Sequence, residues 1–319
     1  MTNFSVYIST KDDISYAEEP IKQALQVSDD IVIVDSSNPE NYKKLMDLCR
    51  RYKQIRIYWV PPLGHREPLF YYALSKCKYT WVLHLNAFER MNESLIKDIH
   101  NIVSKATADI IKIDSTHYDL DGKDPIFTSQ NIFLINKERV KVLGYIHYGF
   151  DLDRSKISTL EHKYNVKHLS GYKPFIEGGG YKNMDHYMPA EKYIWRKPYG
   201  KKKYAIYLVL KWIYLGSKRL FSLSREPLQS RINVIRFMIA HDKARLNSFY
   251  ANPDEIPHQL KVQQEIRKVG IINYLHLYTD QDIRRINNYS KRTGLSGSKL
   301  FVDLVENAYR EHNKQTQRS

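Results

Sequence analysis

Strand signals and helix signals alternate along the first half of the chain, and this alternation limits the possible folds more than any other feature. Ile31–Val34 is a run of β-branched residues, as is typical of a strand buried on both faces. Other strands are predicted at Phe4–Ser9, Ile55–Val60, Thr80–Leu85 and Asp109–Asp114. Helices are predicted between them at Ala17–Val27, after Asn38-Pro39, and at Pro68–Lys76. The pattern predicts an α/β fold, a mostly parallel sheet flanked by helices.

The middle of the chain is basic and aromatic. Residues 115–190 mix short strands with loops, and Gly178-Gly179-Gly180 indicates a flexible loop. Residues 192–245 contain 14 Lys and Arg residues. Within them, Lys203–Leu215 is apolar on nearly every face, and about 13 residues are too few to span a bilayer. This segment is either an interfacial helix on an anionic membrane or a buried helix of a small helical subdomain.

The last part of the chain predicts a strand followed by two helices. Ile271–Tyr278 alternates in polarity, Thr279 can cap a helix, and Gly294 can end it before Ser296 starts another. Three units are therefore expected. They are an α/β domain at 1–190, a basic aromatic helical region at 191–270, and a small strand-helix-helix tail at 271–319.

Charge and cysteine content indicate the partners and the compartment. The formal net charge of +15 favours anionic partners, namely nucleotide diphosphates, anionic lipids or nucleic acid. Cys49 and Cys77 fit buried free thiols in a reducing compartment. The N-terminus lacks a signal-peptide pattern, and no apolar run reaches the length of a membrane span. We expect a cytoplasmic protein, attached peripherally to the inner face of the membrane.

Two polar clusters follow predicted strands. Asp35 ends the run Ile31–Val34, and ligands of parallel sheets bind beyond the carboxyl ends of the strands. Asp35 either contacts a base or ribose there, or caps the next turn. The strand Thr80–Leu85 ends in Asn86-Ala87-Phe88-Glu89, where Asn86 and Glu89 supply the oxygen atoms that a hard cation needs.

In order and spacing, these segments resemble the family-2 GT-A glycosyltransferases, especially the type that acts on lipopolysaccharide cores. The carrying stretches are SVYISTKDD, DDIVIVDSSNPENYKKLMDLC and REPLFYYALSKCKYTWVLHLNAFERM. The resemblance implies a Rossmann-like GT-A catalytic domain. It further implies inverting transfer of a sugar from a nucleotide-sugar donor to a hydroxyl of a glycan or lipid-linked glycan.

The resemblance also implies donor contacts. It places Thr10 and Asp35 at the base and ribose, and Asn86 at the donor edge. Arg66 lies in the loop before the next helix, where it contacts the diphosphate or only solvent. The family usually has Asp-Ala-Asp-Glu where this chain has Asn86-Ala87-Phe88-Glu89. Glu89 therefore binds Mn²⁺ or Mg²⁺ in place of the missing aspartate, or the enzyme uses Lys and Arg instead of a metal, or activity has been lost.

Inverting transfer needs a base near the acceptor hydroxyl. The family writes a His-Glu pair where this chain has His147 followed by Tyr148. Asp151 and Asp153 lie just downstream and can supply the carboxylate, as can Glu177 before the triple glycine. His147 is an acceptor contact, a metal ligand or a structural histidine.

The tail YLHLYTDQDIRRINNYSKRTGLSGSKLFVDLVENAYREH resembles a ribbon-helix-helix module. That resemblance implies a homodimer and allows DNA binding through paired strands. The outward residues of the strand would be Tyr274, His276 and Tyr278, and none is an Arg or Lys that reads bases. A plain helical hairpin is the alternative. The competing function is a catalytically degenerate transferase domain serving as a dimeric scaffold or DNA-binding protein.

Overall fold

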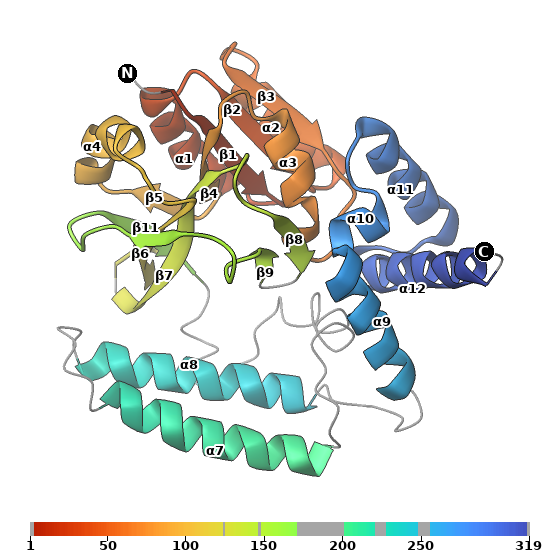
Figure 1. The fold of residues 1–319 in the computed structure, drawn as a ribbon. Helices are drawn as coiled ribbons and strands as arrows, with labels where there is room; N and C mark the ends of the chain where they lie inside the picture. Colours follow the sequence, from red (N-terminus) through yellow and green to blue (C-terminus); the bar gives the residue numbers. More distant parts are fainter. Residues whose placement is uncertain are drawn as a thin grey trace.

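The protein was analysed as a computed structural model, which describes residues 3–123, 125–145, 148–170, 201–220, 228–247 and 256–317. In this part of the chain, nine strands form one sheet in the order β3-β2-β1-β4-β7-β6-β11-β5, with β10 paired to β6 (Figure 1). The strands are β1 (Ser5–Thr10), β2 (Ile31–Asp35), β3 (Ile55–Trp59), β4 (Trp81–Asn86), β5 (Glu89–Met91), β6 (Ile110–Tyr118), β7 (Pro125–Asn136), β10 (Ile157–Thr159) and β11 (Asn165–Leu169).

The sheet is mostly parallel, as predicted. β1 runs parallel to β2 and β4, β2 to β3, and β6 to β10 and β11. Three pairs are antiparallel, namely β4–β7, β6–β7 and β5–β11. A separate two-stranded hairpin is made by β8 (Val142–Tyr145) and β9 (Tyr148–Phe150). The predicted α/β architecture is confirmed.

Helices cover both faces of the sheet, which explains the unbroken β-branched run in β2. Ile31 and Ile33 pack into the core that contains α1 (Ile14–Val27), α2 (Pro39–Cys49) and α4 (Glu93–Ser104). Val32 and Val34 face the opposite core, which contains η1 (Glu67–Leu69) and α3 (Phe70–Lys76). Since successive residues of a strand point to opposite faces, a strand buried on both sides must be apolar at every position.

The C-terminal helices belong to this second core. They are α9 (Ile256–Val269), α10 (Ile271–Leu275), α11 (Asp280–Thr293) and α12 (Gly297–Thr316). Val262 and Ile266 of α9, and Leu300 and Val305 of α12, are buried in the same cluster as Phe70 of α3. Tyr72 donates a hydrogen bond to Asp280 at the start of α11, at 2.6 Å. The tail is therefore packed onto the sheet domain through apolar contacts (Figure 1).

The predicted strand Ile271–Tyr278 is wrong, because Ile271–Leu275 forms α10. The element is bounded by Gly270 (φ +83°) and His276 (φ +51°), whose left-handed backbone interrupts an extended strand. Its sequence fits both the alternation of a strand and the repeat of a helix, since Ile271, Tyr274 and Leu275 also share a helical face. Tyr274, expected to point outward, is buried. The strand pairing on which the ribbon-helix-helix dimer and its DNA contact depended is therefore not formed here.

Other local signals in the tail and near the amino end are confirmed. Thr279 forms a capping box with Asp282, and Gly294 (φ +68°) ends α11. Asn38 accepts a hydrogen bond from the amide of Asn41 at 3.0 Å, with Pro39 at the first helical position. Short polar side chains and glycine act through the backbone within one turn, so these helix ends are encoded locally.

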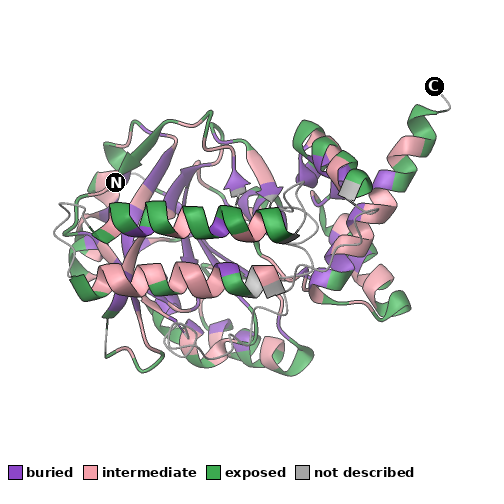
Figure 2. Cartoon of the chain, turned by 90° about the horizontal axis from the view of Figure 1, so that it is seen from below, coloured by how far each residue is buried: buried purple, intermediate pink, exposed green. Residues whose placement is uncertain are grey.

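A helical hairpin lies beneath the sheet. α8 (Leu228–Asn247) packs against β7, where Asn233 donates to the carbonyl of Ile126 at 2.9 Å and Phe237 lies 5.4 Å from the ring of Phe127. α7 (Lys201–Leu220) packs on the outer side of α8. In Figure 2, which views the molecule from below, α7 is largely exposed and α8 largely intermediate. The predicted helix at Lys203–Leu215 thus forms part of α7.

Candidate functional site

A crevice opens at the carboxyl ends of the parallel strands β1, β2 and β4. The register places Thr10 beside Asp35 on one side of β1, and Ser9 beside Asn86 on the other. The two polar clusters singled out in the sequence therefore meet at one edge of the sheet, and beyond that edge lies a cavity of about 430 Å³. Its lining comprises Tyr7, Ser9, Thr10, Lys11, Asp13, Val34, Ser36, Pro62, Leu63, Gly64, His65, Arg66, Glu67, Leu69, Asn86, Ala87, Phe88 and His168.

Asp35 lies under this cavity and is not part of its lining. Its side chain is fully buried. One carboxylate oxygen accepts from Thr10 Oγ1 and Ser37 Oγ, both at 2.6 Å, and the other accepts from the Ser37 amide at 3.0 Å. Burial raises the pKa of the Asp35 carboxyl, while the hydrogen bonds from Ser37 and Thr10 oppose that shift. Asp35 therefore fixes the end of β1 and the turn after β2, and Thr10 and Ser36 present the surface.

The loop between β1 and α1 is held in place by Asp12. This residue has a left-handed backbone (φ +58°). Its carboxylate accepts from the amide and the side chain of Asn38, at 3.0 and 2.8 Å, and from the side chain of Asn41 at 2.9 Å. Three hydrogen bonds thus tie the loop to the start of α2 and offset the cost of the unusual backbone conformation. Asp12 thereby also fixes the backbone of its neighbours Lys11 and Asp13.

Two cationic side chains line the cavity. Arg66 is exposed, and its guanidinium donates to Asn86 Oδ1, which also accepts from Ser9 Oγ at 2.9 Å. Lys11 lies on the lining with Arg66. The Arg66 contact orients the guanidinium across the carboxyl ends of β1 and β4. Guanidinium and ammonium groups are the donors with which proteins commonly bind phosphate oxygens.

Asp13 is a lining carboxylate with an altered acidity. Burial raises the pKa of Asp13 to about 6, and the hydrogen bond from the Lys11 amide, at 3.3 Å, opposes that shift. A carboxyl in a cleft with a pKa displaced toward neutrality is a common mark of a functional site. The sequence offered no signal for it, since its burial arises from the surrounding elements.

Glu89 is bound within the protein rather than presented to the cavity. It is 5% exposed. One oxygen accepts from the Asn86 amide at 2.8 Å, and the other contacts His168 Nδ1 at 3.2 Å. Burial would raise the pKa of Glu89, but the hydrogen bond and the charge of His168 outweigh burial and lower it to about 2. Since an ionised carboxylate only accepts hydrogen bonds, His168 Nδ1 carries the proton, and its other ring nitrogen is left to act as donor or acceptor.

Glu89 and Asn86, the predicted oxygen donors for a metal ion, are already hydrogen-bonded within the protein. Both oxygens of Glu89 are engaged, and Asn86 Oδ1 already accepts from Ser9 and Arg66. In the described ranges, no group of three or more His, Cys, Asp or Glu side chains is arranged to hold an ion. The described donor set does not fit Mn²⁺ or Mg²⁺, and a divalent cation remains a prediction from the sequence.

The residues predicted to supply the base lie elsewhere or outside the described ranges. Asp151 and Asp153 follow β9 and do not line the cavity. Asp151 faces Arg154, at 3.7 Å, and Asp153 is exposed. His147 and Glu177, together with the triple glycine, fall outside the described residues.

The C-terminal helix α12 supports the loop that carries Arg66. The amide of Gly297 donates to the carbonyl of Pro62 at 2.9 Å. Gly64 has a left-handed backbone (φ +78°), and a Cβ there would lie 2.7 Å from the Ser298 amide nitrogen. The ring of His65 lies 6.5 Å from that of Phe301. The loop is therefore sandwiched between the sheet edge and the start of α12, and this arrangement requires glycine at position 64.

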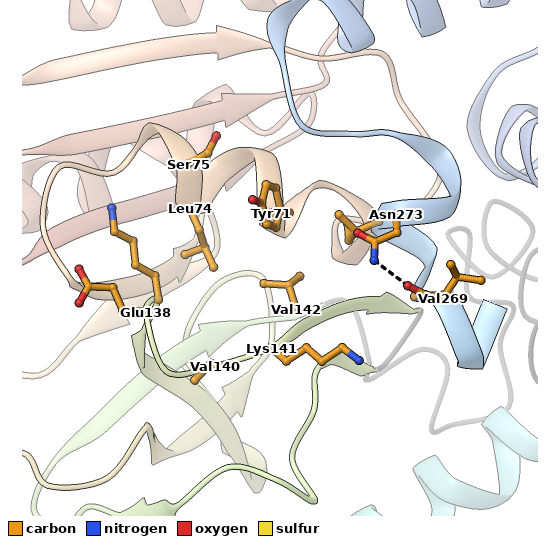
Figure 3. A pocket seen from close by; sticks show the side chains of 12 residues that line it. Tyr71, Leu74, Ser75, Glu138, Val140, Lys141, Val142, Val269 and Asn273 are labelled. Atoms are coloured by element: carbon orange, nitrogen blue, oxygen red, sulfur yellow. Dashed lines mark hydrogen bonds between the residues drawn. The ribbon is translucent and has the colours of Figure 1, made fainter. Parts of the chain in front are cut away.

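A second cavity, of about 400 Å³, lies between α3, the residues before β8 and the α9–α10 junction (Figure 3). It is found near the amino end of β4, since Lys137 and Glu138 follow the residue of β7 that pairs with Trp81. Two of its polar side chains are engaged within the protein. Glu138 accepts from Thr80 at 2.7 Å, and Asn273 donates to the Val269 carbonyl at 2.8 Å. Ligands of parallel sheets bind at the opposite, carboxyl end, so the first cavity is the candidate site.

No protein-family model and no curated protein matches the chain. Among solved structures it is similar to TarS of S. aureus, at 15% identity and a TM-score of 0.41, over 70% of this chain and 44% of that one. It is also similar to TarS 1–349 in complex with UDP-GlcNAc (14%, TM-score 0.43) and with UDP (13%, TM-score 0.42), each over 92% of both chains. The chain thus spans less than half of the longer TarS chain, and at these values no residue role is transferred.

Proposed function

We propose that this chain is a glycosyltransferase that takes a nucleotide-sugar donor into the crevice at the carboxyl ends of β1, β2 and β4. The observation that carries the proposal is the position of Arg66 and Lys11 on the lining of a cavity at this edge. Ligands of parallel sheets bind at such an edge, and a diphosphate needs cationic donors there. The polar residues Thr10, Ser36 and Asn86 then face the nucleoside and the sugar.

In the proposed transfer, cationic side chains stabilise the leaving group. In the reaction, the acceptor oxygen attacks the anomeric carbon of the donor sugar, and the bond from that carbon to the diphosphate oxygen breaks. The electron pair of that bond leaves with the nucleoside diphosphate, and the proton of the acceptor hydroxyl passes to a base. Arg66 and Lys11 offset the charge that develops on the leaving diphosphate. Glu89 holds His168 in one orientation at the same edge.

Several parts of the proposal come from the sequence. Inversion at the anomeric carbon follows from the resemblance to family-2 transferases. Glu177 and His147 are the proposed base and acceptor contact. The proposed acceptor is a hydroxyl of a glycan or lipid-linked glycan, and the proposed location is the inner face of the cytoplasmic membrane. Among helices of the described ranges, none is both long and apolar enough to traverse a bilayer.

Donor binding by the Arg66→Ala variant tests the proposal. Wild-type protein is expected to bind UDP- or GDP-sugars and to melt at a higher temperature in their presence, because a ligand of the native state stabilises it by about 2.7 kcal/mol at 100 times its Kd. Arg66→Ala should weaken binding roughly 10- to 100-fold, since hydrogen bonds to charged groups contribute about 1.5–3 kcal/mol. Thermal shift and titration calorimetry measure both effects.

Arg50→Ala is the matched control, because Arg50 is an exposed arginine at the end of α2 that pairs with the exposed Asp47 at 3.8 Å. It should bind the donor as the wild type does. Equal binding by wild type and Arg66→Ala, or no binding of any nucleotide sugar by the wild type, would contradict a donor site in this crevice.

A further inference from the structure

α7 presents an apolar face to solvent. Ile206, Leu210, Ile213 and Tyr214 lie on one side of the helix at helical spacing and are 61%, 62%, 62% and 66% exposed. Exposed apolar residues gathered in one stripe differ from the scattered apolar residues of an ordinary surface, and they indicate an interaction site. In Figure 1, α7 lies farther from the sheet than α8, and in Figure 2 it is largely exposed.

The opposite side of α7 is fixed to α8, which determines the direction of the apolar face. Leu208 is buried. Lys211 Nζ and Trp212 Nε1 both donate to Asp242 of α8, at 2.8 and 3.0 Å. Asp242 is 1% exposed, and a buried carboxylate that keeps two donors resists rotation of the helix about its axis. The apolar stripe is therefore held outward rather than folded into the protein.

The charges of α7 select the partner. The helix contains Lys201, Lys202, Lys203, Lys211, Lys218 and Arg219, and no Asp or Glu. Lys202 and Lys203 are exposed at one end and Lys218 at the other, so both ends of the apolar stripe are positive. A second copy of the chain packed on this stripe would bring like charges together in either direction. An anionic lipid surface instead offers negative headgroups to the lysines and an acyl boundary to the apolar side chains.

We propose that α7 is an interfacial helix, lying in the plane of an anionic membrane with Ile206, Leu210, Ile213 and Tyr214 inserted among the lipids. Lys202, Lys203 and Lys218 contact the headgroups. Nothing in this arrangement requires the chain to cross the bilayer. The binding is independent of the donor site, so it stands or fails separately from the proposed transfer reaction.

Flotation with vesicles tests the proposal. The full chain is mixed with vesicles of phosphatidylglycerol and phosphatidylcholine, or of phosphatidylcholine alone. The wild type should float with the anionic vesicles and much less with the neutral ones. Lys202→Glu/Lys203→Glu/Lys218→Glu and Leu210→Ser/Ile213→Ser should each bind anionic vesicles at least about tenfold more weakly. The control is Lys43→Glu/Lys53→Glu/Lys105→Glu, which reverses three exposed lysines elsewhere and should float like the wild type.

A labelled variant keeps the test informative if a multiple variant folds poorly. Cys49 and Cys77 are both buried, so an environment-sensitive dye attached to Ile213→Cys reports on α7. Its emission should shift to the blue with anionic vesicles, while the same dye on Lys53→Cys should not respond. Absence of that shift, flotation of the α7 variants equal to the wild type, or self-association through α7 without vesicle binding would overturn the proposal.

Discussion

At the residue scale, the crevice combines the buried carboxylate of Asp35, which organises it, with lining groups that would meet a ligand. Asp35 is buried beneath the cavity and holds Thr10 and Ser37, whereas Arg66 and Asp13 lie on the lining. A charge on the lining acts directly on an anion bound in the cavity. Substitutions at these residues are therefore expected to act differently. Those at Asp35 change the shape of the crevice, and those at Asp13 or Arg66 change the charge on its lining.

Nucleotide-sugar affinity should rise as the pH falls through about 6. Asp13, whose pKa burial raises to about 6, is ionised above that pH and repels the diphosphate, and it becomes neutral below it. Calorimetric titrations between about pH 5 and pH 7.5 should show roughly three- to tenfold tighter binding at the acidic end. A nucleotide sugar is the right probe, because its diphosphate is esterified at both ends and does not titrate in this range.

Asp13→Asn should remove most of this pH dependence and bind at neutral pH about as tightly as the wild type does at low pH. Asp47→Asn, an exposed aspartate of α2, should leave the dependence unchanged. A pH profile that is the same in Asp13→Asn and in the wild type would assign the dependence to another group.

At the scale of elements, the loop of Pro62 to Arg66 depends on a helix far away in sequence. Gly64→Ala should destabilise the protein and weaken donor binding, because the left-handed backbone costs a non-glycine residue about 1–2 kcal/mol and the new Cβ meets Ser298 of α12. The loop must then shift and carry Arg66 with it. Melting temperature and donor affinity measure the two consequences.

Gly294→Ala is a matched control for backbone strain without a clash. Gly294 also has a left-handed backbone (φ +68°), but a Cβ there has nothing within 4 Å. It should lower the melting temperature less and leave donor affinity at the wild-type value. Equal losses of affinity in the two variants would show that the contact with α12 does not position the loop.

The elements of the sheet could be predicted because their signals are local. The run Ile31–Val34 encodes a strand buried on both faces, and Asn38 with Pro39 encodes a helix start. α10 could not be predicted, because Ile271–Leu275 fits a strand and a helix equally, and the packing of Ile272 and Leu275 into the shared core decides between them. In the site, Asn86 directly follows the strand signal Thr80–Leu85, and Arg66 lies in the loop between a predicted strand and the next predicted helix. His168 was missed because it reaches the cavity only through the pairing of β11 with β5.

At the scale of the whole molecule, a single apolar core joins the sheet to the C-terminal helices. Leu300 is fully buried in the cluster that also contains Phe70 and Val82. Leu300→Ala should cost about 2–5 kcal/mol of stability, the usual range for removing a buried leucine side chain. Because the core is shared, scanning calorimetry should show one transition at a lower temperature. Two separated transitions, with only the first affected, would indicate that the helices unfold on their own.

The contact of Gly297 with Pro62 also bears on the order in which the protein is made. Strands β1 to β4 and the Arg66 loop are all translated before the ribosome reaches the residues that buttress that loop. A nascent chain can align Thr10 with Asp35 early, yet the proposed diphosphate-binding edge becomes rigid only after α12 has emerged. Full affinity for the proposed donor is therefore expected only once α12 is in place.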